Sequence, residues 1–171
     1  QRIFFIYNWG GSEGGKTAAL HAALSVWGDP DSLKVSFNAT RVGLEYTAAF
    51  YKDLPLGLNE RQLAGDKQDS VEQTVYMLSE GASKVRGTKG GGLQKIKQWR
   101  TIVIATGEVE LAGSSSQTGV STRVLEIYGG PFDNKIEASN MYPFTAQCHG
   151  HAGPVFVQNL INDMDKKIVP D

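Results

Sequence analysis

The segment Gly10–Thr17, which reads GGSEGGKT, has the residue types and spacing of a loop that wraps around phosphate groups. Glycines let backbone N–H groups turn inward around an anion, because no Cβ stands in the way. Lys16 is expected to reach the β- and γ-phosphates of ATP, and Thr17 to offer its hydroxyl to Mg²⁺. Glu13 is expected to point away from the phosphates, since its charge would repel them. The predicted nucleotide-binding residues are Gly10, Gly11, Ser12, Gly14, Gly15, Lys16, Thr17 and Ala18.

A second candidate site follows the apolar run Leu54–Leu58. In phosphate-loop ATPases a buried strand ends in an acid that orders Mg²⁺, and a following Glu activates water. Here Asn59 stands at the metal-ordering place and Glu60 at the place of the base. Because Asn carries no charge, we expect weaker Mg²⁺ placement but intact nucleotide binding. The alternative is that Asn59 and Glu60 form a simple polar turn.

Two further residues are candidates for sensing the γ-phosphate. Thr106 ends the apolar run IVIAT, where a polar residue can contact that phosphate, or it simply opens a turn before Gly107. Arg123 follows a Gly/Ser-rich segment and can reach the γ-phosphate of its own or a neighbouring subunit. A surface arginine at the start of a strand is the alternative for Arg123.

The segment from Ser83 to Arg100 is basic, glycine-rich and free of acidic residues. Mobile glycines and cationic side chains suit contact with nucleic-acid phosphates, as in a loop that grips DNA in the pore of a ring. A solvated surface loop has the same composition. The DNA-binding candidates are Lys84, Arg86, Lys89 and Lys95.

Composition restricts these hypotheses. The length of 171 residues, with 40% hydrophobic and 20% charged residues, fits one globular domain, 1–171. Net charge is −1, so nucleic-acid binding requires a local basic patch. The single cysteine, Cys148, indicates a reducing, cytoplasmic setting, and the apolar N-terminal run is too short to cross a membrane. With His149 and His151, Cys148 offers metal-type ligands, but no second cluster completes a tetrahedral site, which favours a polar turn.

The surrounding elements must bring these residues together. Buried strands are predicted at 3–7, 34–38, 54–58, 99–106 and 123–128. Helices are predicted at 17–26, at 41–51 with Asn38 or Thr40 as cap, from a cap at Asp69 to about 80, and at 155–164. Loops are expected at 81–92 and 111–121. This alternation predicts an α/β fold with a mainly parallel sheet.

The stretches YNWGGSEGGKTAALHAALSVWGDP, FNATRVGLEYTAAFYKDLPLGLNERQ and WRTIVIATGE resemble the helicase-like ATPase domain of phages and mobile elements, catalogued as domain of unknown function 927. The resemblance covers nearly the whole chain. It implies a RecA/AAA-like P-loop NTPase core, with helices on both faces of its sheet, inside a larger replication protein that often carries a primase module. Asn59 departs from the family pattern, which has Asp at this place.

Two functions remain open on the sequence. The first is a Mg²⁺-dependent ATPase that works as a homo-oligomer and couples hydrolysis to movement on DNA. Single-stranded DNA is the expected partner. The second is a nucleotide-gated DNA-binding or assembly module, in which Asn59 leaves hydrolysis weak or absent. Residue 59 is the sequence feature that separates them.

Overall fold

The computed structural model describes residues 4–60, 68–111 and 118–165. In this part of the chain, five parallel strands form one sheet in the order β2-β3-β4-β1-β5. The three central strands are half-buried or buried, as expected for strands covered by helices, whereas the two edge strands are partly exposed. The strands are β1 (Phe5–Trp9), β2 (Lys34–Ser36), β3 (Leu56–Asn59), β4 (Val103–Gly107) and β5 (Val124–Tyr128).

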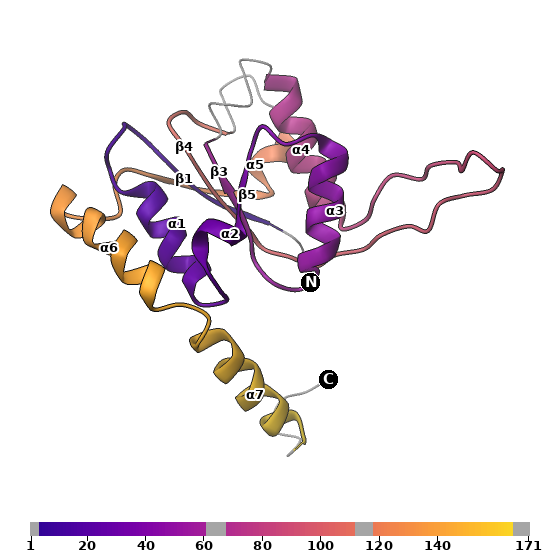
Figure 1. Cartoon of the computed structure of the whole chain (residues 1–171). Helices are drawn as coiled ribbons and strands as arrows, with labels where there is room; N and C mark the ends of the chain where they lie inside the picture. The colour runs from indigo at the N-terminus through magenta and orange to yellow at the C-terminus, as the bar shows by residue number, and fades with distance from the viewer. Residues whose placement is uncertain (1–3, 61–67, 112–117, 166–171) are drawn as a thin grey trace.

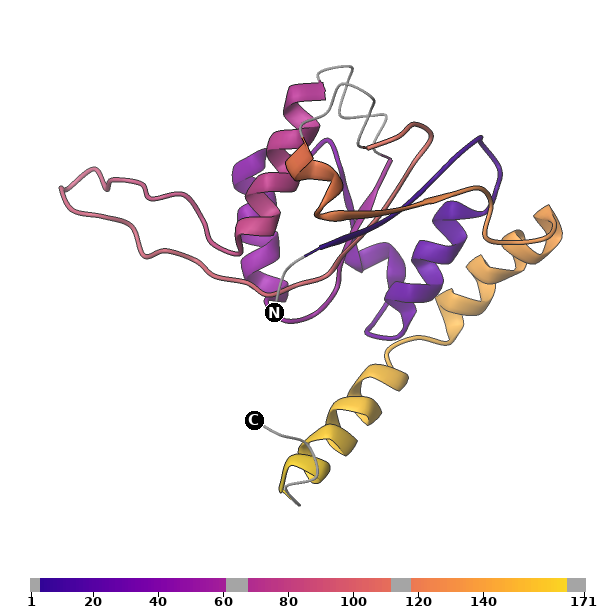
Figure 2. The same ribbon diagram turned by 180° about the vertical axis from the view of Figure 1, so that it is seen from behind.

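Helices lie on both sides of this sheet (Figures 1 and 2). On one side α1 (Lys16–Ser25) packs against α2 (Pro30–Leu33) and α6 (Lys135–Gln147). On the other side α4 (Gln68–Glu80) packs against α3 (Arg41–Tyr51) and α5 (Thr118–Ser121). The predicted α/β fold with a parallel sheet between helices is therefore confirmed.

The main hydrophobic core lies between the sheet and the helices α3 and α4. Strand residues alternate in direction, so one face of each strand is free to point into this core. Helix positions three and four apart supply the opposing apolar surface. The core includes Phe5, Tyr7, Leu44, Ala48, Leu56, Leu58, Val71, Val75, Leu78, Val103 and Ala105.

The boundaries of several elements differ from the predictions. β4 begins at Val103 because Trp99, predicted as strand, is held at the end of α4 by a hydrogen bond from its indole N–H to the Leu78 carbonyl (2.8 Å). α4 already includes Asp69, so the prediction of Asp69 as its cap was wrong. Thr40 caps α3, since its hydroxyl accepts a hydrogen bond from the Gly43 N–H (3.1 Å).

Three helices were not predicted: α2, α5 and α6. α5 falls in the segment 111–121 that was expected to be a loop, of which 112–117 lies outside the described residues. α6 contains Pro143, which weakens the helical pattern in the sequence. The polar turn predicted around Cys148 connects α6 to α7 (Ala152–Asp165).

Two segments extend away from the sheet (Figure 1). Residues 82–98, expected as part of a loop, form a hairpin arm with antiparallel bridges between Ala82 and Gln98 and between Gly87 and Leu93. The second segment is α7, which exposes apolar side chains such as Phe156. No helix in the described ranges is both long and apolar enough to span a membrane.

Candidate functional site

The candidate site lies at the carboxyl ends of the central strands. After β1 the chain crosses to β2 at one edge of the sheet, and after β4 it crosses to β5 at the other edge. The connections that follow the adjacent strands β1 and β4 therefore run in opposite directions. Ligands of open α/β sheets bind at such a point. A pocket is found there, about 250 Å³ in volume, between the glycine loop (Gly10–Thr17) and the ends of β3 and β4. Its lining residues are Ser12, Glu13, Gly15, Lys16, Thr17, Asn59, Glu60, Thr106, Gly107, Glu108 and Tyr142.

The glycine loop takes its shape from tight contacts with the chain after β5. Gly15 caps α1 in the left-handed region (φ 79°), and a Cβ there would lie 2.5 Å from the Phe132 ring and 2.9 Å from the Ala138 Cβ. Gly14 touches Gly130 backbone to backbone, because a Cβ on Gly130 would lie 2.7 Å from the Gly14 carbonyl oxygen. Gly15 is therefore required sterically, and Gly14 leaves little room for a side chain, since its Cβ would lie 3.1 Å from the Gly130 Cα.

Four of the predicted nucleotide-binding residues line the pocket: Ser12, Gly15, Lys16 and Thr17. The other four do not. Ala18 is buried in the first turn of α1. Gly10, Gly11 and Gly14 are not among the residues that line the pocket.

Lys16 and Glu13 are both held by nearby groups. The Lys16 side chain is buried, and its Nζ donates to the Gly11 carbonyl oxygen across the loop (2.6 Å). The carboxylate of Glu13, which also has a left-handed backbone (φ 66°), is paired with Lys135 at the start of α6. That hydrogen bond from Lys135 lowers the pKa of the Glu13 carboxyl. Lys135 thus neutralises Glu13 from outside the loop, but Glu13 also lines the pocket, so its expected orientation away from the phosphates stays a prediction.

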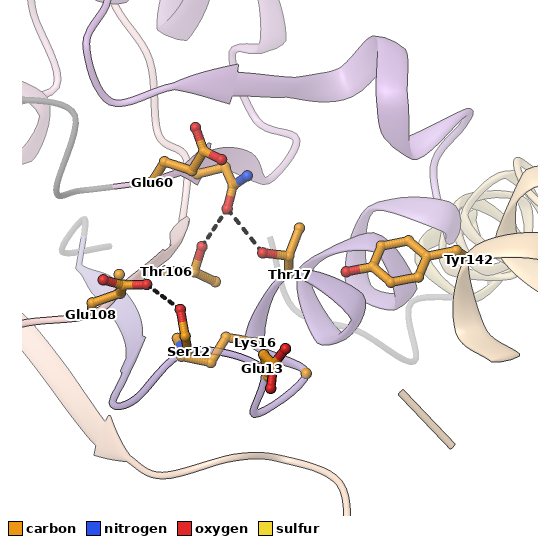
Figure 3. A pocket seen from close by; sticks show the side chains of 11 residues that line it. Ser12, Glu13, Lys16, Thr17, Glu60, Thr106, Glu108 and Tyr142 are labelled. Atoms are coloured by element: carbon orange, nitrogen blue, oxygen red, sulfur yellow. Dashed lines mark hydrogen bonds between the residues drawn. The ribbon is translucent and has the colours of Figure 1, made fainter. Parts of the chain in front are cut away.

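Asn59 joins the glycine loop to the end of β4. Its Oδ1 accepts a hydrogen bond from the Thr106 hydroxyl (2.6 Å) and a longer one from the Thr17 hydroxyl (3.4 Å). Figure 3 draws the two bonds as dashed lines from the labelled Thr106 and Thr17. Asn59 and Thr106 are both buried. Parallel pairing of β3 with β4 matches Leu58 to Ala105, which sets the two polar residues side by side at the strand ends. The predicted metal residues Thr17 and Asn59 therefore meet in one cluster with Thr106.

Glu60 and Glu108 add two carboxylates to the same end of the pocket (Figure 3). Glu60 is exposed and has a left-handed backbone (φ 62°), which turns the chain away from β3. Glu108, which the sequence analysis did not select, accepts a hydrogen bond from the Ser12 hydroxyl (2.5 Å). Its place two residues after Thr106 is a signal that was available in the sequence.

Such an arrangement can bind an anion and place a cation and a water beside it. The N-terminal end of α1 and Lys16 supply positive charge for phosphate. Hydroxyl, amide and carboxylate oxygens are the ligands that Mg²⁺ takes in proteins. Among the described residues, no group of three or more His, Cys, Asp or Glu side chains is placed to hold a metal by itself.

Arg123 lies far from this pocket. It precedes β5 at the amino edge of the sheet, and β5 runs parallel to β1, so one strand length of roughly 16 Å separates it from the loop edge. Its guanidinium donates to the Gly119 carbonyl oxygen (2.6 Å) and lies over the Tyr76 ring. The prediction that it contacts the nucleotide of its own subunit does not fit this position; contact with a neighbouring subunit stays a prediction.

The four DNA-binding candidates lie on the hairpin arm, but they differ. Lys84, Lys89 and Lys95 are exposed. Arg86 instead forms two hydrogen bonds to the buried carboxylate of Glu45 on α3 (2.6 and 3.0 Å). These bonds lower the pKa of the Glu45 carboxyl. Arg86 therefore fixes the base of the arm to the domain.

Among solved structures, one that is similar to this chain is described as a helicase. The chain is similar to "SCCmec type IV Cch - active helicase", with a TM-score of 0.73 and 28% sequence identity. The similarity covers 96% of this chain but 30% of the helicase chain. This chain therefore spans under a third of the length of that helicase. No curated protein matches the sequence.

A family model also matches the chain. It is described as "Domain of unknown function (DUF927)" and matches residues 1–98, more than half of the 171 residues. The matched region includes the glycine loop, Asn59 and Glu60, and the hairpin arm. The chain therefore belongs to the DUF927 family.

Proposed function

We propose that this domain binds ATP with Mg²⁺ in the pocket at the end of β1, and hydrolyses it as part of a helicase-like replication protein of a mobile element. The solved structure it resembles is described as an active helicase, and the similarity extends over 96% of this chain. The order of the five parallel strands, with β1 between β4 and β5, supports a RecA/AAA-like core.

One observation carries the proposal: the hydroxyls of Thr17 and Thr106 both donate to Asn59 beside Lys16. Buried polar groups that are hydrogen-bonded to one another hold a fixed geometry before any ligand arrives. Three separate segments of the chain supply them, from the glycine loop, β3 and β4. A glycine-rich turn with a purely structural role has no need of such a cluster.

The roles follow from charge and position. Lys16 and the amides at the start of α1 bind the phosphates, and Thr17 with Asn59 holds the Mg²⁺ ion. Glu60 polarises the attacking water, since it is a carboxylate in the same pocket. Thr106 senses the γ-phosphate through its hydroxyl, which already bonds Asn59.

DNA is the proposed partner of the hairpin arm. Its exposed lysines, Lys84, Lys89 and Lys95, suit the phosphates of a single strand. In the assembled protein, a homo-oligomer would give Arg123 a γ-phosphate to contact, that of the neighbouring subunit.

A second function is favoured by Asn59 itself. Its amide has no charge, and its Oδ1 is already engaged by two hydroxyls. A site of this kind can bind nucleotide yet place Mg²⁺ poorly, so that ATP binding alone organises subunits or a DNA contact. Slow hydrolysis with tight nucleotide binding would distinguish this module from a motor.

The test is nucleotide binding and turnover in the full-length protein. We expect the parent to bind ATP with Mg²⁺ and to release phosphate faster when single-stranded DNA is added. Lys16→Ala should abolish binding, whereas Lys89→Ala, an exposed lysine on the arm, should leave ATP affinity unchanged. Equal ATP affinity in the Lys16→Ala variant and the parent would overturn the proposal.

A further inference from the structure

Helix α6 contributes Tyr142 to the lining of the pocket, on a side that the glycine loop does not cover. Three contacts fix it there: Lys135 pairs with Glu13, Ala138 lies against Gly15, and Tyr142 meets the His21 ring of α1. The first two contacts involve the loop and the third involves the helix that follows it. The position of Tyr142 relative to the loop is therefore set by packing along the length of α6.

The two ends of the pocket differ in chemistry. Glu60 and Glu108 lie at one end, close to Thr106, and the uncharged ring of Tyr142 lies at the other, beyond Thr17 (Figure 3). A phosphate chain can face carboxylates where Mg²⁺ screens it, at the Thr17 and Asn59 oxygens. The uncharged, flat part of a nucleotide is better placed away from them, against an aromatic surface.

We propose that Tyr142 is the nucleoside contact of this site, with its ring packing against the base of the bound nucleotide. This inference rests on the proposed nucleotide binding and adds the orientation of the ligand. The γ-phosphate then lies toward Glu60 and Glu108, and the base lies over α6.

The environment of Tyr142 fits this role. Tyr142 is 41% exposed although it lines the pocket, so it offers apolar surface for a ligand to cover. Its hydroxyl end points toward Thr17 (Figure 3). The ring is held in an edge-on contact with the buried His21 ring, at 5.0 Å between centroids, and His21 lies 3.0 Å from the Lys34 ammonium. An aromatic side chain fixed in this way loses little conformational entropy when a base packs on it.

The experiment compares ATP with inorganic tripolyphosphate, both with Mg²⁺, by calorimetric titration of the full-length protein. Tripolyphosphate carries the phosphate chain without a base. We expect Tyr142→Leu to weaken ATP binding roughly tenfold, since base–aromatic stacking is of that order. The same variant should bind tripolyphosphate as the parent does. Tyr142→Phe, which keeps the ring, should bind both ligands within about twofold of the parent.

Phe144→Ala is the matched control, because Phe144 is an exposed aromatic of the same helix that does not line the pocket. It should change neither affinity. Equal ATP affinity in the parent and the Tyr142→Leu variant, or equal losses for ATP and tripolyphosphate, would overturn the assignment of Tyr142. If instead the parent binds neither ligand, the proposed function itself fails, so the two failures are distinguishable.

Discussion

The pocket and the hairpin arm are both proposed to meet phosphate, yet the structure prepares them in different ways. In the pocket, Lys16, Asn59 and Thr106 are buried and hydrogen-bonded. On the arm, Lys84, Lys89 and Lys95 are exposed, whereas Arg86 is paired with Glu45 and Lys97 lies over the Tyr46 ring. The pocket therefore has a fixed geometry before its ligand binds, whereas the arm presents charge on a projecting hairpin (Figure 2).

This difference separates recognition by shape from recognition by charge. A site with fixed donors selects a ligand of matching size, and small displacements of its backbone are costly. A cationic hairpin attracts any polyanion, and its binding falls steeply as salt is added. Substitutions should therefore act on geometry in the pocket and on ionic strength at the arm.

The largest effect is expected at Gly15. Gly15→Ala places a Cβ 2.5 Å from the Phe132 ring in a left-handed backbone, so we expect a loss of about 3 kcal/mol or more in stability and the loss of nucleotide binding. Gly11→Ala is the matched control for stability, because nothing lies within 4 Å of its Cβ position. Thermal unfolding compares the two variants, and ATP titration compares Gly15→Ala with the parent. Equal behaviour of the two variants would contradict the packing of the loop against Phe132.

The next effect is expected on the arm. Neutralising Lys84, Lys89 and Lys95 together should weaken single-stranded DNA binding by more than tenfold. The slope of the logarithm of the binding constant against the logarithm of salt concentration should become shallower by about 2, at about 0.7 per lost phosphate contact. Arg86 is left intact, because its replacement would release the arm from Glu45. DNA binding between low and moderate salt measures the slope. An unaltered slope would leave the arm as a solvated hairpin.

A smaller effect concerns the Glu45 carboxylate and pH. The pKa of Glu45 is lowered in the folded protein, chiefly by its hydrogen bond from Arg86. As pH falls, Glu45 therefore takes up a proton in the unfolded state before it does so in the folded state. The stability that the Glu45 carboxylate contributes is present above about pH 4.5 and is lost as pH falls further. Glu45→Gln should cost about 1–3 kcal/mol at pH 7 and flatten the fall in stability below pH 4.5. Urea unfolding from pH 3 to pH 7 measures this, and parallel curves for parent and variant would refute it.

The smallest effect is expected at Asn59. Asn59→Asp restores a charge beside Thr17 and Thr106. We therefore expect the rate of phosphate release to rise several-fold, which corresponds to an activation free energy lower by roughly 1 kcal/mol. Asn59→Ala, which removes the shared acceptor, should lower turnover instead. Multiple-turnover phosphate release with single-stranded DNA measures both. If the Asp variant is no faster than the parent, Asn59 does not limit hydrolysis.

The features predicted from sequence were those determined by neighbouring residues. The strand before the glycine loop, the helix after it and the cap at Thr40 all depend on short stretches of chain. Strand pairing then brings Asn59 beside Thr106, two residues that the sequence analysis had placed separately at strand ends.

The features that were missed depend on distant contacts or on a weak local pattern. Of the alternatives for Arg123, contact with the nucleotide of its own subunit does not fit, because the parallel register of β5 carries Arg123 to the opposite edge. α6 buries few of its side chains and contains Pro143, so its hydrophobic pattern is poor. A local signal did exist: Asn134 and Glu137 form a reciprocal cap, with 2.9 Å from the Glu137 N–H to Asn134 Oδ1. With α6 unrecognised, Tyr142 had no place in the predicted site.

The backbone contact between Gly14 and Gly130 makes the phosphate-type loop a two-part module. The parts are 116 positions apart in the sequence, and a Cβ on Gly130 would lie 2.7 Å from the Gly14 carbonyl oxygen, whereas one on Gly14 would lie 3.1 Å from the Gly130 Cα. Transplanting Gly10–Thr17 into another scaffold would therefore require the turn at Gly129 and Gly130 as well. An insertion after β5 would disturb the loop as directly as an insertion within it.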